Sequence, residues 1–226
     1  MGQHILSGNP PIEVNLRRSA RARRLSLRVS ALDGRVTLTL PPGLPESEAL
    51  EFARSKQSWL AGHLADRAPE VAIVPGASLP VEGRMLRLEA GTGRRVVVCG
   101  DALYVPASDP ARLQAWLKAL ARDRLAAASD HYAGLLGRPY ARLTLRDTRS
   151  RWGSCSSTRG LSYSWRLIMA PPDVLNYVAA HEVAHLEQMN HSPAFWAVVA
   201  RLMPEYGEHR TWLRRSGTAL HRYRFD

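Results

Sequence analysis

The sequence predicts an α+β protein that is rich in strands in its first half and rich in helices in its second. Apolar and polar residues alternate with a period of two on both sides of a D-G pair near residue 33. Apolar residues recur at three- and four-residue intervals from about residue 109 onwards. The chain has 226 residues, 45% hydrophobic and 23% charged, which is the composition of a globular protein and excludes disordered, collagen-like and disulfide-scaffold classes.

The elements expected in the first half are a β-hairpin, one helix and a second small group of strands. The hairpin pairs residues 25–30 with residues 36–40 through its D-G turn. A Pro-Glu-Ser-Glu opening predicts a helix over 45–66. Short apolar runs separated by glycine predict a meander of strands within 79–107.

The second half is expected to contain four helices and two strands. Asp109-Pro110 resembles a helix cap followed by a first-turn proline, so a helix should follow it to about residue 136. Strands are expected at 143–146 and 161–165, on either side of a loop over 147–160, and further helices at 171–189, 193–203 and 206–220. We therefore divide the chain into a β-rich N-terminal portion, 1–107, and a portion that carries the chemistry, 108–226.

The net charge of +11 arises from 29 arginines and two lysines against 20 acidic residues. Six arginines cluster at 17–28 beside the first hairpin and others scatter along helix faces, so we interpret most of this charge as a solvated surface. The two cysteines are isolated, the N-terminus lacks the pattern of a secretory signal, and no apolar run is long enough to span a membrane. These features predict an intracellular, cytoplasmic protein without a membrane partner.

The segment with the clearest chemistry is H-E-x-x-H at 181–185, inside an expected helix. Residues four apart lie on one face of a helix, so His181 and His185 can bind the same metal ion. Glu182 would lie at the edge of that site, where a general base can take a proton from water. The pattern predicts one zinc ion with Glu182 as the catalytic residue.

A catalytic zinc site needs a third protein ligand and an open position. His191 is the first candidate, because a helix that ends near residues 189–190 would let the chain turn back towards the metal. A carboxylate from a later helix, Glu205 or Glu208, is the alternative.

Five further residues are candidates for contacts with a substrate or a reaction oxyanion. Arg149 and Arg151 flank an expected turn and could hold a carboxylate or phosphate, and Ser154 could donate a hydrogen bond. Tyr206 and His209 could stabilise an oxyanion. The alternative for each is structural: Trp152 anchors the turn, the arginines pair with carboxylates, and Tyr206 packs in the core. Cys155 is a weak candidate for a nucleophile or ligand.

Several separated blocks resemble the YgjP-like metallopeptidase family, a bacterial group related to the SprT-like and WLM zincins. The blocks are R-W-G-S-C-S at 151–156, Y-V at 177–178, H-E-V-A-H-L at 181–186, N-H-S at 190–192, F-W at 195–196 and M-P-E-Y at 203–206. The resemblance extends over about 17–220 and implies one continuous domain of zincin-like fold, with a small sheet over an active-site helix. It implies His181, His185 and His191 as zinc ligands and Glu182 as general base.

These observations predict a zinc metallopeptidase that hydrolyses peptide bonds in a peptide or protein substrate. One alternative is a metal-dependent nucleotide phosphohydrolase that uses Arg149 and Arg151 as an anion clamp. A second alternative is a DNA-associated, SprT-like protease, which is not favoured because the sequence contains no zinc-finger tail or helix-turn-helix signature.

Overall fold

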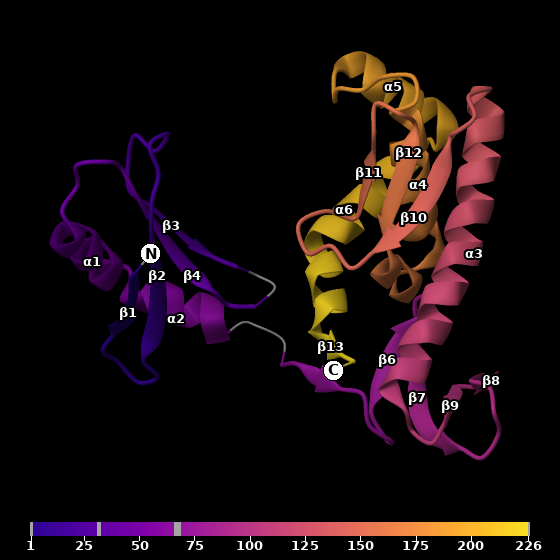
Figure 1. Cartoon of the computed structure of the whole chain (residues 1–226), viewed down its shortest axis with the longest axis horizontal. Coiled ribbons are helices and arrows are strands. Elements are labelled where there is room, and N and C mark those ends of the chain that lie inside the picture. Colours follow the sequence, from indigo (N-terminus) through magenta and orange to yellow (C-terminus); the bar gives the residue numbers. More distant parts are fainter. Residues whose placement is uncertain (1, 31–32, 66–68, 226) are drawn as a thin grey trace. The chain divides into compact units, whose positions relative to one another are not determined.

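A computed structural model describes residues 2–30, 33–65 and 69–225, which form two compact units, Met1–Pro69 and Glu70–Asp226 (Figure 1). The structure is mixed helix and sheet, with several small sheets. Among the described residues, no helix combines the length and the apolar character needed to cross a membrane.

The first unit is a four-stranded sheet covered by two short helices. The strand order is β1-β2-β4-β3, with the central pair parallel and both outer pairs antiparallel. The strands are β1 (Gly2–Leu6), β2 (Ile12–Arg18), β3 (Ser26–Val29) and β4 (Val36–Leu40), followed by α1 (Glu46–Ser55) and α2 (Gln57–Ala65). Val14, Leu16, Leu38 and Leu40 alternate along the strands and pack with Ala49, Ala53 and Leu60 of the helices.

The second unit contains two principal sheets and the remaining helices. One sheet has the order β6-β7-β9-β8 and is built from β6 (Ser78–Val81), β7 (Arg84–Gly91), β8 (Val97–Cys99) and β9 (Ala102–Pro106). The other has the order β10-β12-β11 and is built from β10 (Arg142–Arg146), β11 (Gly153–Cys155) and β12 (Gly160–Ser164). A short parallel pair joins β5 (Val71–Ala72) to β13 (Tyr223–Arg224).

The helices of the second unit give its sheets a common core. The longest is α3 (Pro110–Leu136), which runs past both sheets (Figure 1). The others are η1 (Trp165–Met169), α4 (Pro172–Ala184), α5 (Pro193–Leu202), α6 (Tyr206–Ser216) and η2 (Gly217–Arg222). Leu79 of β6 and Leu103 of β9 share one buried cluster with Leu113 of α3. The strands of 79–107 therefore share a core with the helices that follow them.

Several expected elements are confirmed, and they show the strand pairing and helix capping that the sequence pattern predicts. β3 and β4 pair antiparallel, with Val29 opposite Val36; residues 31–32 of the expected hairpin lie outside the described part of the chain. The Asp109 side chain accepts a hydrogen bond from the Ala111 N–H at 2.9 Å, and a left-handed Gly137 ends α3.

Other expectations were wrong in their boundaries. The helix expected over 45–66 is divided at Lys56, where α1 ends. The loop expected over 147–160 contains strand β11, a three-residue edge strand too short to produce a period-two pattern. The helix expected to reach residue 189 ends at Ala184. The hairpin β1–β2 and the helix η1 were not expected, and the helix expected over 206–220 is divided into α6, which ends at Ser216, and η2, which begins at Gly217.

Candidate metal centre

Helix α4 lies in the middle of the second unit and is buried on almost every side. It packs against α3, α5, α6, η1 and β11. Proline at its first position and Asp173 in its first turn are favourable at a helix N-terminus. Its buried side chains run from Val174 to Ala184 and include Glu182, which is only 5% exposed. A central apolar helix therefore brings His181 and Glu182 into the protein interior.

The chain turns sharply after the last residue of α4. The N–H of Leu186 donates to the Val183 carbonyl at 2.9 Å, and the N–H of Gln188 donates to the Ala184 carbonyl at 3.0 Å. The turns after Ala184 end the helix earlier than its apolar periodicity indicates, although His185 still has right-handed helical backbone angles. The residues after the turn then lead back past α4 to His191.

Three imidazoles converge beside the end of α4. The metal-binding atoms of His181, His185 and His191 all lie within 4.8 Å of one another. Nε2 of His181 and Nε2 of His191 are 3.1 Å apart. The Phe195 ring lies against all three imidazoles, with centroid separations of 4.9, 4.4 and 4.8 Å. This apolar support from α5 fixes the rings without supplying hydrogen bonds.

The hydrogen bonds of these imidazoles leave nitrogen lone pairs available for a metal. Nδ1 of His185 lies 2.9 Å from the Gln188 carbonyl oxygen, so this nitrogen carries the proton and Nε2 is free to coordinate. Nδ1 of His181 is buried and has no partner among the described residues.

The surroundings keep the two histidines of α4 neutral. Burial, then the neighbouring His185 and His191, lowers the pKa of His181 to about 3. Burial also lowers the pKa of His185. Both are therefore uncharged near neutral pH, which is the form that binds metals.

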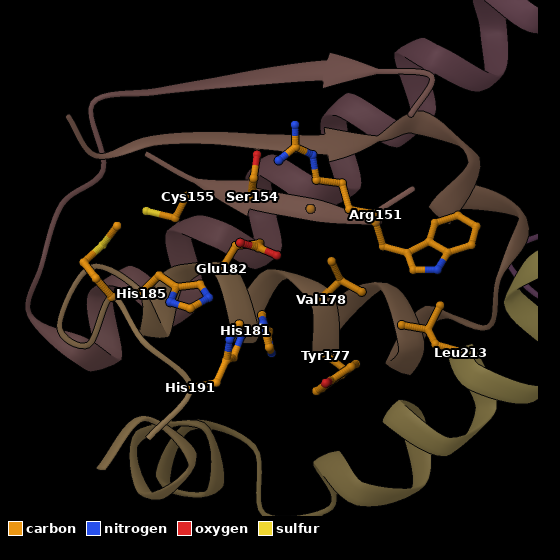
Figure 2. Close-up of a pocket in the computed structure, with 13 residues that line it drawn as sticks. Arg151, Ser154, Cys155, Tyr177, Val178, His181, Glu182, His185, His191 and Leu213 are labelled. Carbon is orange, nitrogen blue, oxygen red and sulfur yellow. Dashed lines mark hydrogen bonds between the residues drawn. The ribbon is translucent and has the colours of Figure 1, made fainter. Parts of the chain in front are cut away.

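The Glu182 carboxyl lies beside the three imidazoles, between α4 and β11 (Figure 2). Burial raises its pKa to about 8, against the opposing effects of the Arg151 charge and of a backbone hydrogen bond from Cys155. Its carboxylate is not one of the atoms in the group that could hold a metal. It lies beside the candidate ligands without being one of them.

Gly153 of β11 makes room for that carboxyl. A Cβ built on Gly153 would lie 2.6 Å from Cγ and 2.6 Å from Oε1 of Glu182. The glycine does not have a positive φ, so close approach and not backbone conformation accounts for it here. The edge strand consequently determines where the Glu182 carboxyl can lie.

An open cavity of about 410 Å³ joins these groups to the solvent. Its lining includes His181, Glu182, His185 and His191 together with residues of β11 and of the segment before it (Figure 2). A cavity of this size lies within the range of small-ligand clefts.

The cavity includes some of the other candidate residues and not others. Arg151, Ser154 and Cys155 line it. Arg149, Tyr206 and His209 do not line it. Tyr206 instead stacks between Trp196 and Tyr177, with centroid separations of 5.5 and 6.4 Å. Within the described residues, the metal-binding group does not include Glu205 or Glu208.

Cys155 faces the cavity, but its environment does not activate it. Burial, followed by the nearby Glu182, raises the pKa of its thiol to about 11. A thiol with so high a pKa is not a thiolate nucleophile near neutral pH.

Tyr177 lines the cavity, although the sequence analysis did not single it out as a functional residue. It precedes His181 by four residues and so lies on the same face of α4. Burial raises the pKa of its hydroxyl to about 12, so the hydroxyl keeps its proton. In the sequence, the position of Tyr177 four residues before His181 was the signal that could have identified it as a functional residue.

A sequence model described as "YgjP-like, metallopeptidase domain" matches residues 23–216. The chain belongs to the YgjP-like metallopeptidase family. Membership supports a hydrolase that uses a metal. A comparison with curated proteins finds no significant match.

Among solved structures, the crystal structure of the metallopeptidase zymogen of Pyrococcus abyssi abylysin is similar over 41% of this chain and 95% of that chain. The sequence identity is 20% and the TM-score is 0.37.

Proposed function

We propose that this YgjP-like protein is a zinc metallopeptidase in which His181, His185 and His191 hold one zinc ion and Glu182 is the general base. The observation that carries the proposal is the convergence of three imidazoles beside a buried carboxyl that is not among them. Three protein ligands with one open position characterise catalytic zinc sites, whereas structural sites are closed by four.

The donor set fits zinc in chemistry and in spacing. Two nitrogens bound to a tetrahedral zinc at 2.0–2.1 Å are separated by about 3.3 Å. The 3.1 Å between Nε2 of His181 and Nε2 of His191 is close to that value. This spacing would let one cation be coordinated by both nitrogens.

When bound, zinc would polarise the scissile carbonyl and lower the pKa of water towards neutrality. Glu182 would accept the proton of the attacking water and deliver it to the amine nitrogen that leaves. Burial raises the pKa of this carboxyl to about 8, so the carboxyl can both gain and release a proton near neutral pH. A neighbouring cation would favour its ionised form.

Residues around the cavity would hold the peptide during this reaction. Tyr177 keeps its proton, so its hydroxyl can donate to an oxyanion. Ser154 and Arg151 offer further donors from the β11 side. Of the two arginines in the anion-clamp alternative, only Arg151 lines the cavity, which weakens the nucleotide phosphohydrolase hypothesis.

A substrate screen on the zinc-loaded protein tests this function. Wild-type protein and the Glu182→Gln variant are incubated with a quenched-peptide library, with nucleoside triphosphates and with DNA-bound protein. We expect peptide cleavage by the wild type, and in the variant unchanged zinc content without turnover. Phosphate release that depends on Glu182, without peptide cleavage, would replace the proposal by the phosphohydrolase alternative. Cleavage only in the presence of DNA would replace it by the SprT-like alternative.

A further inference from the structure

The sheet β10-β12-β11 has a second cavity on its other face. Leu143 and Leu145 of β10 and Tyr163 of β12 point to the core, so the residues between them point away from it. That outward face carries a hollow of about 410 Å³, whose lining includes Arg142, Thr144, Arg146, Arg151, Ser154 and Ser162.

The lining of this second cavity is strongly basic. It includes Arg142, Arg146 and Arg151, and no carboxylate of the described chain lines it. Many other arginines are paired: Arg84 with Asp101 at 3.0 Å and Arg124 with Glu82 at 2.6 Å are examples. For the three cavity arginines, the structure gives no ion pair within its described residues. Arg142 and Arg146 thus bring positive charge to the hollow without an ion-pair partner in the described chain, and Arg151 adds a third charge that also acts on Glu182.

The strand register arranges these groups around a central row of hydroxyls. Thr144, Ser162 and Ser154 lie side by side across the three strands. The Thr144 hydroxyl already donates to the Leu161 carbonyl at 3.3 Å. In the described structure, the hydroxyls of Ser154 and Ser162 have no hydrogen-bond partner and remain available as donors. The centre of the hollow is therefore polar.

Arg142 and Arg146 lie on β10 on either side of Thr144, at the β10 end of this row. They are four residues apart on one strand, so their Cα atoms are about 13 Å from each other. The Arg142 side chain lies over the neighbouring strand, because a Cβ on Gly160 would meet its Nε at 3.3 Å. Gly160 keeps that space clear, and the guanidinium extends across the sheet.

We propose that this hollow binds a di- or triphosphate group, free or carried by a larger molecule. Guanidinium forks match phosphate oxygens, and two forks spaced along β10 on either side of Thr144 favour an elongated anion over a single phosphate. Among the described residues, no aromatic side chain lines the hollow, whereas single-stranded nucleic acid is generally held by aromatic stacking. The features therefore favour a compact phosphate chain over a nucleic-acid strand.

The proposed site is separate from the metal centre. In Figure 2, the Ser154 side chain and the Arg151 guanidinium lie on the side of β11 away from Glu182. Arg151 borders both cavities and is the link between them. The inference goes beyond the peptidase proposal, and its test measures binding rather than cleavage.

Titration calorimetry of inorganic triphosphate into the zinc-loaded full chain at low ionic strength tests the site. We expect one binding site that weakens as salt is added. Arg142→Gln and Arg146→Gln should each weaken binding about 10-fold or more, because each removes a charge-assisted contact. Ser162→Ala should weaken it by a smaller factor. Arg94→Gln, on an exposed loop outside the hollow, is the matched control and should bind as the wild type does.

Further titrations identify the source of the phosphate, and a zinc measurement shows whether triphosphate removes the metal by chelation. Orthophosphate should bind more weakly than triphosphate, because it cannot reach both arginines. Equal affinity for inorganic and nucleoside triphosphate would support a site for the phosphate chain alone, and tighter nucleoside binding would support a nucleotide carrier. Zinc content measured after each titration detects removal of the metal. No binding of triphosphate, or binding that both arginine variants retain, would overturn the proposal, as would binding of single-stranded DNA alone.

Discussion

Replacing Gly153 by alanine displaces the Glu182 carboxyl while leaving the metal ligands in place. The new Cβ would lie 2.6 Å from Cγ and Oε1 and 2.8 Å from Cδ of Glu182. Ordinary contacts begin near 3.4 Å, so the carboxyl must move by about 0.8 Å. A displacement of about 1 Å at a reacting group can cost about 100-fold in rate, or about 2.7 kcal/mol of activation free energy. We expect kcat/KM for peptide cleavage to fall by that factor.

The assay for Gly153→Ala compares kcat/KM, zinc stoichiometry and the thermal midpoint of the variant with those of the wild type. Zinc content should stay near one ion per chain, because the three atoms nearest the new methyl group all belong to Glu182 and none to a histidine. Gly134→Ala is the matched control: nothing lies within 4 Å of its built Cβ, so activity should be unchanged. Full activity of folded Gly153→Ala would refute the role assigned to the edge strand and to Glu182.

Three further predictions follow from the site and its surroundings. His191→Ala should lower zinc stoichiometry well below one while Glu205→Ala leaves it unchanged, as measured by metal analysis after dialysis; zinc loss in Glu205→Ala alone would identify a carboxylate ligand. Tyr177→Phe should lower kcat about 100-fold with little change in KM, since it removes an oxyanion donor; an unchanged kcat would exclude that role. Asp147→Asn should destabilise the fold by about 1–2 kcal/mol at pH 7, measured by urea unfolding, because the carboxylate is partly exposed but holds the buried Arg166 through bonds of 2.7 and 3.2 Å.

The pH dependence of the Asp147 effect has a definite sign. Burial of the carboxyl raises its pKa, but the hydrogen bond and charge of Arg166 outweigh burial and the net pKa is lowered from 3.8. A carboxyl with a lowered pKa in the folded state stabilises the fold above its unfolded pKa and loses that contribution as pH falls through the folded value. The difference between wild type and Asp147→Asn should therefore shrink below about pH 4. A difference that grows in acid would contradict this assignment.

Strongly patterned elements could be predicted from sequence, and short or context-dependent ones could not. Alternation around a D-G turn predicts the β3–β4 hairpin, and capping residues predict the start of α3. β11 has only three residues, and its pairing with β12 comes from a neighbour in space rather than from its own propensity. The early end of α4 depends on turn hydrogen bonds around His185, which apolar periodicity does not encode.

The candidate metal group could be anticipated because its members are close in sequence. His181 and His185 share a helix face, and His191 follows six residues after His185, beyond the turn that ends the helix. Contacts that arise from tertiary packing were less accessible. Nothing local in the sequence indicates that Gly153 lies against Glu182, or that Arg142 and Arg146 share a hollow with Arg151. Tyr206 and His209 were chosen for their chemistry, yet neither lines the cavity.

X-ray absorption spectroscopy at the zinc edge of the purified, zinc-loaded protein tests the central claim most directly. The account predicts one zinc per chain with three imidazole nitrogens at about 2.0–2.1 Å and one oxygen from solvent, and loss of one nitrogen in His191→Ala. A sulfur ligand at about 2.3 Å, which would implicate Cys155, would contradict the account. So would a fourth protein ligand that closes the site, or a protein that binds no zinc.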